Sequence, residues 1–249
     1  MLNTITHGVP TDTRPLLIVH GLFGSARNWG VIAKRLSDTR QVIAVDMRNH
    51  GDSPWMDSHT YRDMADDLAT VIADIGAPVD VMGHSMGGKA AMMLALTRPE
   101  LVRRLIVADI APVAYSHTQD GPLAAMQGVD LSTIASRKDA QAQMPVDAAT
   151  ATFLLQSLDL EHKCWKLNLD VLAHDMTAIV GWPDVTGQFT GPARFLRGAN
   201  STYVPDTAEP AIRAAFPAAV IETVADAGHW LHAEQPRAVE AAVRAFLDG

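Results

Sequence analysis

Gly83-His84-Ser85-Met86-Gly87 is the stretch that decides the fold, because it places a serine between two glycines where one apolar run gives way to another. Residues 78–82 before it are typical of a short buried strand, and residues 88–96 after it are typical of a helix. A strand that turns directly into a helix needs neighbours without a Cβ, so that the serine can adopt a strained conformation with its hydroxyl exposed. The stretch therefore predicts a nucleophile elbow.

The motif is a weak signal by itself, because glycine and serine at about 7% each produce G-x-S-x-G by chance in roughly one chain of this length in a dozen. Two other stretches strengthen it. Residues 14–21 are an apolar run that ends in His-Gly, where an oxyanion-hole loop would follow a strand. Near the C-terminus, His229 follows the strand-like run 219–225. An early serine and a late histidine give the chain order expected of a hydrolase built on this architecture.

Composition limits the classes of protein to which the chain can belong. Its 249 residues suit one catalytic domain with an insertion. With 20 Lys and Arg against 28 Asp and Glu, the net charge of −8 disfavours nucleic acid or an anionic membrane as the main partner. The single cysteine, Cys164, excludes an intramolecular disulfide, and we expect it to pack in the interior rather than to act as a catalytic thiol.

Neither a targeting segment nor a membrane-spanning segment is expected from the sequence. Residues 1–8 have neither a basic region nor a long apolar run, so a secretory signal is not expected. No run approaches the roughly 18 apolar residues of a spanning helix, so membrane insertion is not expected either. We therefore expect a cytoplasmic protein, with a processed organellar enzyme as the alternative.

Apolar runs alternate with amphipathic runs along most of the chain, which is typical of a mostly parallel sheet covered by helices on both faces. The sequence predicts this α/β class. The expected strands are 16–19, 41–46, 79–82, 105–108, 193–197 and 219–223. The expected helices are 29–36, 61–76, 88–97, 207–216 and 236–247.

The alternation stops between residues 112 and 182, where polar helical segments replace it. Helices are expected at 123–128, 130–137, 147–158 and 171–179, and no strand is expected. An insertion at this point would lie over the carboxyl ends of the strands, where open α/β sheets bind ligands. We therefore divide the chain into a core of residues 1–111 and 183–249 and a helical cap of residues 112–182.

The chain resembles the α/β-hydrolase superfamily over nearly its whole length. The resemblance is carried by six blocks of sequence that occur in the expected order. Their residues are 20–25, 46–53, 83–89, 109–113, 198–204 and 228–234. Within the superfamily, the chain is most similar to the small esterases and thioesterases of the bacterial YbfF type and their eukaryotic relatives. That closer resemblance rests mainly on Asn49, Lys89 and residues 200–203.

Ser85 is the candidate nucleophile, which needs a base because a free hydroxyl reacts poorly at neutral pH. The alternative is a serine that only serves a tight turn. His229 is the candidate base, since it alone among the ten histidines combines a late loop position with a preceding strand. His232 and Glu234 lie nearby in sequence, but no cluster of further ligands accompanies them, so we expect no metal and no cofactor.

The sequence identifies the acid of the expected triad less directly than it identifies the nucleophile and the base. Many relatives have Gly-x-x-Asp after the strand that corresponds to residues 194–197, whereas here Gly198-Ala199-Asn200 is followed by Ser201. Asp109 ends the strand 105–108, one sheet position nearer the elbow, and the resemblance to YbfF-type enzymes also points to it. Asp226 and Asp206 are the alternatives. Ser201 is then either a supporting hydrogen-bond partner of the same His or Asp, or a plain loop serine.

The backbone N–H groups of Met86 and Leu22 are the expected oxyanion-hole donors. Phe23 and Trp182 are candidate substrate-binding residues, with core packing as the alternative. Lys89 lies four residues after Ser85 and so misses the S-x-x-K spacing of a Ser-Lys pair. We expect it to brace the loop or to attract an anionic substrate group. The other cap residues that would line an acyl pocket or form the core of the cap are Met126, Met144, Leu154 and Trp165.

Arg48, His50 and Asp52 belong to a polar loop that we expect to brace the catalytic end of the sheet. The resulting hypothesis is a serine hydrolase that cleaves short to medium acyl carboxylic esters or acyl-CoA thioesters through an acyl-enzyme on Ser85. Its partner would be a small-molecule ester or thioester. The alternatives on the same triad are a cofactor-free perhydrolase and a C–C bond hydrolase. A low-turnover ligand-binding protein on a hydrolase scaffold is the alternative from another class.

Overall fold

Seven strands form one sheet in the order β1-β3-β2-β4-β5-β8-β9 in the computed structural model, which describes residues 1–76 and 78–249. β1 pairs antiparallel with β3, and the remaining neighbours pair parallel. The strands are β1 Thr4–His7, β2 Leu16–Val19, β3 Val42–Val45, β4 Val79–His84, β5 Val102–Ala108, β8 Ala193–Gly198 and β9 Ala219–Val224. The predicted mostly parallel α/β class is therefore confirmed.

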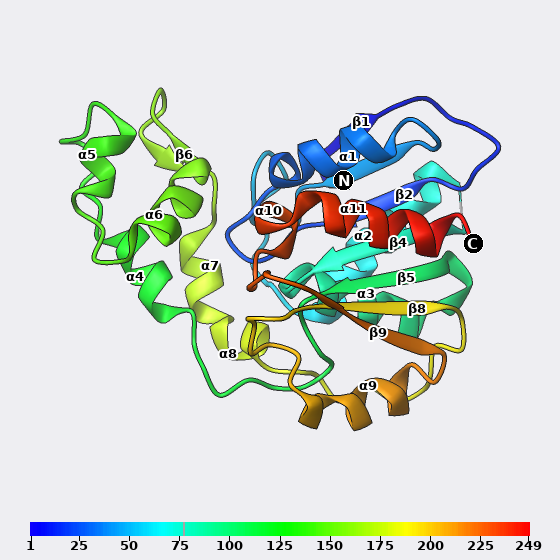
Figure 1. Cartoon of the computed structure of the whole chain (residues 1–249). Coiled ribbons are helices and arrows are strands. Elements are labelled where there is room, and N and C mark those ends of the chain that lie inside the picture. The colour runs from blue at the N-terminus through cyan, green and yellow to red at the C-terminus, as the bar shows by residue number, and fades with distance from the viewer. Residues whose placement is uncertain (77) are drawn as a thin grey trace.

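Helices cover both faces of this sheet, as Figure 1 shows for α11 in front of it and α3 behind it. Leu16 and Ile18 of β2 pack into a cluster with α1 and α11, and Leu17 and Val19 pack into the cluster that holds α2, α3 and α9. Successive side chains of a strand point to opposite faces, so both faces are apolar and the strands read as continuous apolar runs. The helices are α1 Gly30–Leu36, α2 Tyr61–Ile75, α3 Met86–Thr97, α9 Glu209–Ala215, α10 Leu231–Glu234 and α11 Pro236–Leu247, with short 3₁₀ turns at Ala26–Trp29, Pro99–Leu101, Leu155–Ser157 and Asp206–Ala208.

The segment between β5 and β8 forms a separate group of short helices beside the sheet, coloured green to yellow in Figure 1. Residues of this group, such as Phe153, line the same cavity as Ser85 and His229, so the group covers the carboxyl ends of the strands. Its elements are α4 Asp120–Gln127, α5 Arg137–Gln141, α6 Ala148–Leu154, β6 Leu158–Asp159, β7 Cys164–Trp165, α7 Leu169–His174 and α8 Met176–Val180.

This region departs from the sequence prediction in several places. The expected helix 130–137 is a turn, because the Asp130 carboxylate accepts the Ser132 N–H at 3.0 Å and so competes with helical pairing. The expected helix 171–179 is interrupted at Asp175. The two-residue strands β6 and β7 form a small hairpin where no strand was expected. Within β7, Trp165 is buried and Cys164 is exposed, so the prediction that Cys164 packs in the interior is wrong.

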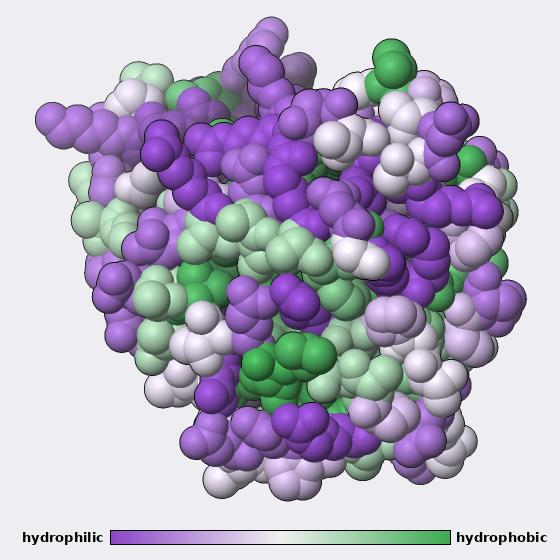
Figure 2. Space-filling view, turned by 45° about the vertical axis from the view of Figure 1, so that its right-hand side comes forward, coloured by the Kyte–Doolittle hydropathy of each residue, from purple (hydrophilic) through white to green (hydrophobic). Residues whose placement is uncertain are grey.

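Polar side chains dominate the surface. Figure 2 shows a face with many hydrophilic residues, on which the most hydrophobic residues appear in several small, separate places. Large apolar residues with substantial exposure include Val9 before β2, Val31 on α1, Val220 on β9 and the adjacent pair Trp55 and Met56. Among the described residues, no helix has both the length and the hydropathy that crossing a membrane requires.

The order of the strands brings distant segments to one edge of the sheet. β4 lies between β2 and β5, and all three run parallel. At their carboxyl ends, β2 is followed by residues 20–24, β4 by Ser85 and β5 by Asp109. The loops after β8 and β9 reach the same edge, so residues from five strand ends can meet there.

A buried ion cluster holds the opposite end of β4. The Asp80 carboxylate is fully buried and accepts hydrogen bonds from Arg103 at 2.8 and 2.5 Å and from Arg40 at 3.3 Å. Arg40 is itself 2% exposed and also pairs with Asp248 near the C-terminus. The cluster therefore ties β4 to β5, to the segment before β3 and to the end of α11.

We expect Asp80→Ala to lower the free energy of unfolding by about 3 kcal/mol, because the buried Arg40 keeps only Asp248 near the surface as its charge partner and Arg103 loses the carboxylate that it binds. Urea denaturation of both proteins measures the difference. The matched control is Asp66→Ala, which removes an exposed partner of Arg98 and should cost less than about 1 kcal/mol. Equal losses in the two variants would contradict the role assigned to burial.

Candidate active site

Ser85 occupies a strained turn between β4 and α3. Its φ of 51° and ψ of −121° lie in a region that residues with a Cβ rarely adopt. The turn is too close for side chains at its two glycines: a Cβ on Gly83 would lie 2.3 Å from the Gly87 carbonyl oxygen, and a Cβ on Gly87 would lie 2.3 Å from that of His20. The sequence prediction of an elbow with glycines at these positions agrees with this geometry.

His229 lies between Ser85 and Asp109. Its Nε2 is 3.0 Å from Ser85 Oγ, and its Nδ1 is 2.8 Å from Asp109 Oδ2. A carboxylate only accepts, so Nδ1 carries the proton and Nε2 keeps a lone pair toward the serine hydroxyl. The imidazole is thus oriented to take the Ser85 proton.

Asp109 is fully buried at the end of β5 and has a φ of 51°. Besides His229, its carboxylate accepts the Gly198 N–H at 2.9 Å and the hydroxyl of Ser201. Ser201 Oγ also accepts the Tyr203 N–H at 3.2 Å. Of the two sequence alternatives for Ser201, this geometry favours a partner of the carboxylate rather than a plain loop serine.

The alternative acids lie elsewhere. Asp206 pairs with Arg197 at 2.6 Å, and its side chain is 85% exposed. Asp226 is exposed on the loop after β9. Within the described part of the chain, neither carboxylate forms a hydrogen bond with His229.

The expected oxyanion-hole donors lie on both sides of the serine. Met86 begins α3, and Leu22 follows His20-Gly21 at the end of β2. Both residues line the same cavity as Ser85, and among the described residues neither N–H has a hydrogen-bond acceptor. The two N–H groups are therefore available to a negatively charged oxygen near Ser85.

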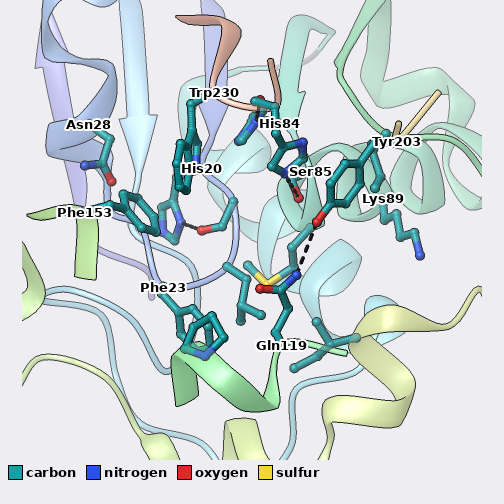
Figure 3. Close-up of a pocket in the computed structure, with 18 of the residues that line it drawn as sticks. His20, Phe23, Asn28, His84, Ser85, Lys89, Gln119, Phe153, Tyr203 and Trp230 are labelled. Carbon is teal, nitrogen blue, oxygen red and sulfur yellow. Dashed lines mark hydrogen bonds between the residues drawn. The ribbon is translucent and has the colours of Figure 1, made fainter. Parts of the chain in front are cut away.

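The cavity has a volume of about 270 Å³ and lies between the sheet edge and the cap, with one side open to solvent. Figure 3 shows Phe23, His84, Tyr203 and Trp230 around Ser85. Of the two predicted substrate-binding residues, Phe23 lines the cavity and Trp182 does not. The centres of the Trp182 and Tyr61 rings are 6.2 Å apart, and of these two residues Tyr61 is the one that lines the cavity. Among the other cap candidates, Leu154 lines the cavity, whereas Met126, Met144 and Trp165 are buried in the core.

Sequence reasoning missed the residues that cover His229. The Tyr203 ring stacks on the imidazole with a centroid distance of 3.7 Å and an interplanar angle of 16°. Gln119, at the start of α4, donates to the Tyr203 hydroxyl at 3.2 Å, so the contact joins cap and core (Figure 3). Tyr203 belongs to the block 200–203 noted above, but nothing local in the sequence indicates a stack on a residue 26 positions later.

Comparison with known proteins matches residues 16–242 to the "Alpha/beta hydrolase family". The chain belongs to this family. The Escherichia coli (strain K12) protein "Esterase YbfF" is 40% identical over 243 residues, which cover 95% of this chain and 94% of the relative. The Mus musculus "sn-1-specific diacylglycerol lipase ABHD11" is 40% identical over 247 residues, with 93% and 80% covered. A solved structure described as "Marine microorganism esterase" superposes with a TM-score of 0.92 at 37% identity, and 98% of each chain is covered.

These relatives confirm the resemblance to YbfF-type enzymes that the sequence blocks predicted. The protein is accordingly a hydrolase of the esterase and lipase kind.

Lys89 of this hydrolase is buried under the end of the cap. Its Nζ donates to the carbonyl oxygens of Val180 and Gly181 at 3.0 and 2.5 Å and lies 4.6 Å from the centre of the Tyr115 ring. Burial lowers the pKa of Lys89 to about 7. Of the two expected roles, bracing fits these contacts, because the side chain joins α3 to the last turn of α8.

Three further histidines, His20, His50 and His59, are buried at the carboxyl end of the sheet. Burial lowers the pKa of His20, lowers that of His50 well below its usual range and lowers that of His59 to about 3. The nearby Arg48 guanidinium also lowers the pKa of His59. All three rings are therefore neutral at pH 7.

Stability of the hydrolase should fall in mild acid. The unfolded chain binds a proton at His59 near pH 6.5, whereas the folded chain binds it near pH 3. Between these values the free energy of unfolding therefore decreases as the pH falls, by about 1.4 kcal/mol per pH unit for this histidine. Urea denaturation at pH 7.5, 6 and 5 should show a shallower pH slope for His59→Gln than for the wild type. His162→Gln, at an exposed position, is the control and should keep the wild-type slope.

Activity should distinguish the candidate acids. We expect Asp109→Asn to lower kcat by about 10⁴-fold, because an amide at this position no longer holds the imidazole tautomer that accepts the serine proton. Asp226→Asn should stay within a few-fold of wild type. Steady-state kinetics on a chromogenic ester measures both. The assignment is wrong if Asp109→Asn keeps kcat near wild type while Asp226→Asn loses several orders of magnitude.

Proposed function

We propose that Ser85, His229 and Asp109 form the catalytic triad of a serine hydrolase that cleaves carboxylic esters with short to medium acyl chains. The observation that carries this proposal is the continuous chain from Ser85 Oγ through His229 to the buried Asp109 carboxylate, with spacings of 3.0 and 2.8 Å. Ser85 lines a cavity together with Leu22 and Met86, whose backbone N–H groups have no acceptor among the described residues. These are the groups that acyl transfer requires.

The reaction proceeds in two halves. Ser85 Oγ attacks the acyl carbon while His229 Nε2 takes the hydroxyl proton, and the N–H groups of Leu22 and Met86 stabilise the resulting oxyanion. Collapse of this intermediate breaks the bond to the leaving group, which receives the proton from His229. A water molecule then loses a proton to His229 and attacks the acyl-enzyme, and the carboxylic acid is released. Asp109 keeps the imidazole oriented throughout.

The walls of the cavity suit an acyl chain. Three apolar side chains line it: Ile110 from the loop after β5, Leu154 from the end of α6 and Ile179 from α8. The cavity volume of about 270 Å³ suits a short or medium acyl chain. The esterase and lipase names of the relatives support an ester as the substrate. A thioester such as an acyl-CoA passes through the same acyl-enzyme. The exposed rim residue His117 marks a side of the cavity at which a long leaving group can extend into solvent.

We also propose that residues 112–182 act as a cap inserted into a core of residues 1–111 and 183–249. The support is that Phe153, Leu154, Ile179 and Val180 of this segment complete the cavity around the proposed nucleophile. In this arrangement, differences in the cap select the acyl chain, whereas the core carries out the chemistry.

The first test is hydrolysis of p-nitrophenyl esters of graded acyl length by the wild type and by Ser85→Ala. We expect the wild type to turn over the shorter esters best and Ser85→Ala to lose roughly 10⁵–10⁶-fold in kcat, because the nucleophile is absent. Acyl-CoA thioesters assayed in parallel with a thiol reagent measure the thioester activity.

Mass spectrometry of the wild type quenched early in turnover should show an adduct of the acyl mass on the peptide that contains Ser85. A circular dichroism spectrum and a melting temperature close to wild type serve as the control that Ser85→Ala is folded. Turnover that persists in a folded Ser85→Ala protein would refute the mechanism. Peracid or ketone cleavage products would instead favour a perhydrolase or a C–C bond hydrolase, and binding without turnover would favour a ligand-binding protein.

A further inference from the structure

We propose that His50 is a positioning residue that acts through Phe23 to aim the Leu22 N–H at the oxyanion. The inference rests on the proposed function, because it assigns a role in the oxyanion hole of that reaction. Figure 3 shows the part of the cavity concerned, where His20 and Phe23 lie on the loop after β2. His50 itself belongs to a different segment, the polar loop between β3 and α2.

Leu22 lies between two peptide groups, each held by a buried histidine. The first carries the Gly21 carbonyl, which accepts from His20 Nδ1 at 2.8 Å, and the Leu22 N–H. The second carries the Phe23 N–H, which donates to His50 Nε2 at 3.1 Å. The Leu22 N–H lies in the plane of the first peptide group, which His20 holds. His50 holds the second group, so the two histidines together restrict both torsions at the Leu22 Cα and with them the direction of the Leu22 N–H.

The His50 ring is itself fixed in the required tautomer. Its Nδ1 lies 2.9 Å from the Arg48 carbonyl oxygen, which can only accept, so Nδ1 carries the proton. Nε2 is then left with a lone pair, which is what the Phe23 N–H needs. The side chain is completely buried, and burial together with neighbouring His20 and His59 holds its pKa well below the usual value. His50 is therefore a permanent acceptor under working conditions.

Phe23 needs such restraint because its backbone is strained. Its φ of 61° lies in the left-handed region, which a bulky residue avoids unless its surroundings impose it. Two hydrogen bonds do so: His50 accepts the Phe23 N–H, and Ser157 Oγ of the cap donates to the Phe23 carbonyl oxygen at 3.0 Å. Without the acceptor at position 50, the Phe23 N–H is buried and unpaired. The Leu22–Phe23 peptide can then rotate, and the loop that carries the Leu22 N–H keeps only the restraint from His20.

The backbone of the His50 loop is anchored to the cap. His50 forms a β-bridge with Leu167, and the Gly51 N–H donates to the Lys166 carbonyl oxygen at 2.8 Å. The ring that holds the oxyanion loop is thus carried on a segment that core and cap hold together. This anchoring gives His50 a fixed position from which to act on Phe23.

The test compares His50→Leu with His50→Gln, since a glutamine Oε1 reaches about as far as the histidine Nε2 and restores the acceptor, whereas leucine does not. We expect His50→Leu to lower kcat by about 10–100-fold with KM within about threefold of wild type, because a misaimed donor is lost mainly from the transition state. His50→Gln should stay within about fivefold of wild-type kcat. The control for lost stability is Val243→Ala on α11, which should match the fall in melting temperature and keep kcat.

Affinity for an alkyl boronic acid, which adds to Ser85 as a tetrahedral mimic, should fall in His50→Leu in proportion to kcat. Affinity for the carboxylic acid product should not change. The proposal is overturned if His50→Leu keeps kcat, or if His50→Gln loses as much as His50→Leu. If the wild type hydrolyses esters and Ser85→Ala does not, either of these two results refutes only the role of His50 and leaves the proposed function standing. A wild type without Ser85-dependent turnover would refute the proposed function instead.

If His50→Leu does not fold, nitrogen-15 NMR of the wild-type imidazoles gives a second test. The proposal requires His50 to be neutral with its proton on Nδ1, and requires the His50 Nε2 and Phe23 amide signals to shift when the boronic acid binds. A proton on Nε2, or signals that do not respond to the boronic acid, would overturn it.

Discussion

The close approach of α3 to the ends of β2 and β4 is the constraint on which the site depends. The helix begins immediately after the strand, and neither Gly83 nor Gly87 has room for a methyl group. Because the chain must turn within one residue, Ser85 takes a positive φ and its hydroxyl points into the cavity. The same contact places the start of α3 beside His20, so Leu22 and Met86, from distant segments, line one cavity. Packing between helix and sheet therefore determines the place of the proposed acyl transfer.

Backbone strain gathers at this edge of the sheet. Among the described residues other than glycine, positive φ values occur at Phe23, Ser85 and Asp109, which follow β2, β4 and β5, as well as at Asn49, Lys163 and Asp226. Each of the first three supplies or supports a group of the proposed reaction. Such conformations persist only where neighbours over-determine them, and here the neighbours are buried hydrogen bonds: Ser85 N–H to Ala108, Asp109 N–H to Leu196, and Phe23 N–H to His50. The strained residues and the parallel sheet thus depend on each other.

The sequence predicts what is set by local pattern and misses what is set by distant partners. All six expected strands lie within the sheet because strands buried on both faces read as apolar runs. β1 escaped notice because it is an edge strand whose four residues are exposed or half-buried, so it carries no such run. Asp109 could be proposed because neighbouring parallel strands end at one edge. The bond from Ser201 to the Asp109 carboxylate was only one of two alternatives, since it depends on how two loops 92 residues apart meet.

Residues whose role is only to hold others are the hardest to find in this way. The Tyr203 ring over His229 and the His50 acceptor for Phe23 join segments 26 and 27 residues apart, and neither has a recognisable spacing. Trp182 does not line the cavity as expected, because its position in the sequence is compatible with more than one place in the structure. A tryptophan in the cap fits either the wall or the layer behind it, and the structure places it behind Tyr61. The sequence therefore predicts the proposed reacting residues more readily than the residues that hold them in position.

Burial and partners divide the histidines around the cavity into two kinds. His20 and His84 bond to backbone atoms, and burial lowers the pKa of both. His232, whose pKa burial lowers to about 4, stacks on Trp29. Of the described histidines that line the cavity, His229 alone has a carboxylate at Nδ1. Because a buried carboxylate stabilises an imidazolium and a carbonyl does so far less, a proton released by Ser85 is best held on His229. His20 and His84 are held by backbone atoms and His232 by its stack on Trp29, so in the proposed reaction His229 is the imidazole that carries the proton between serine and leaving group.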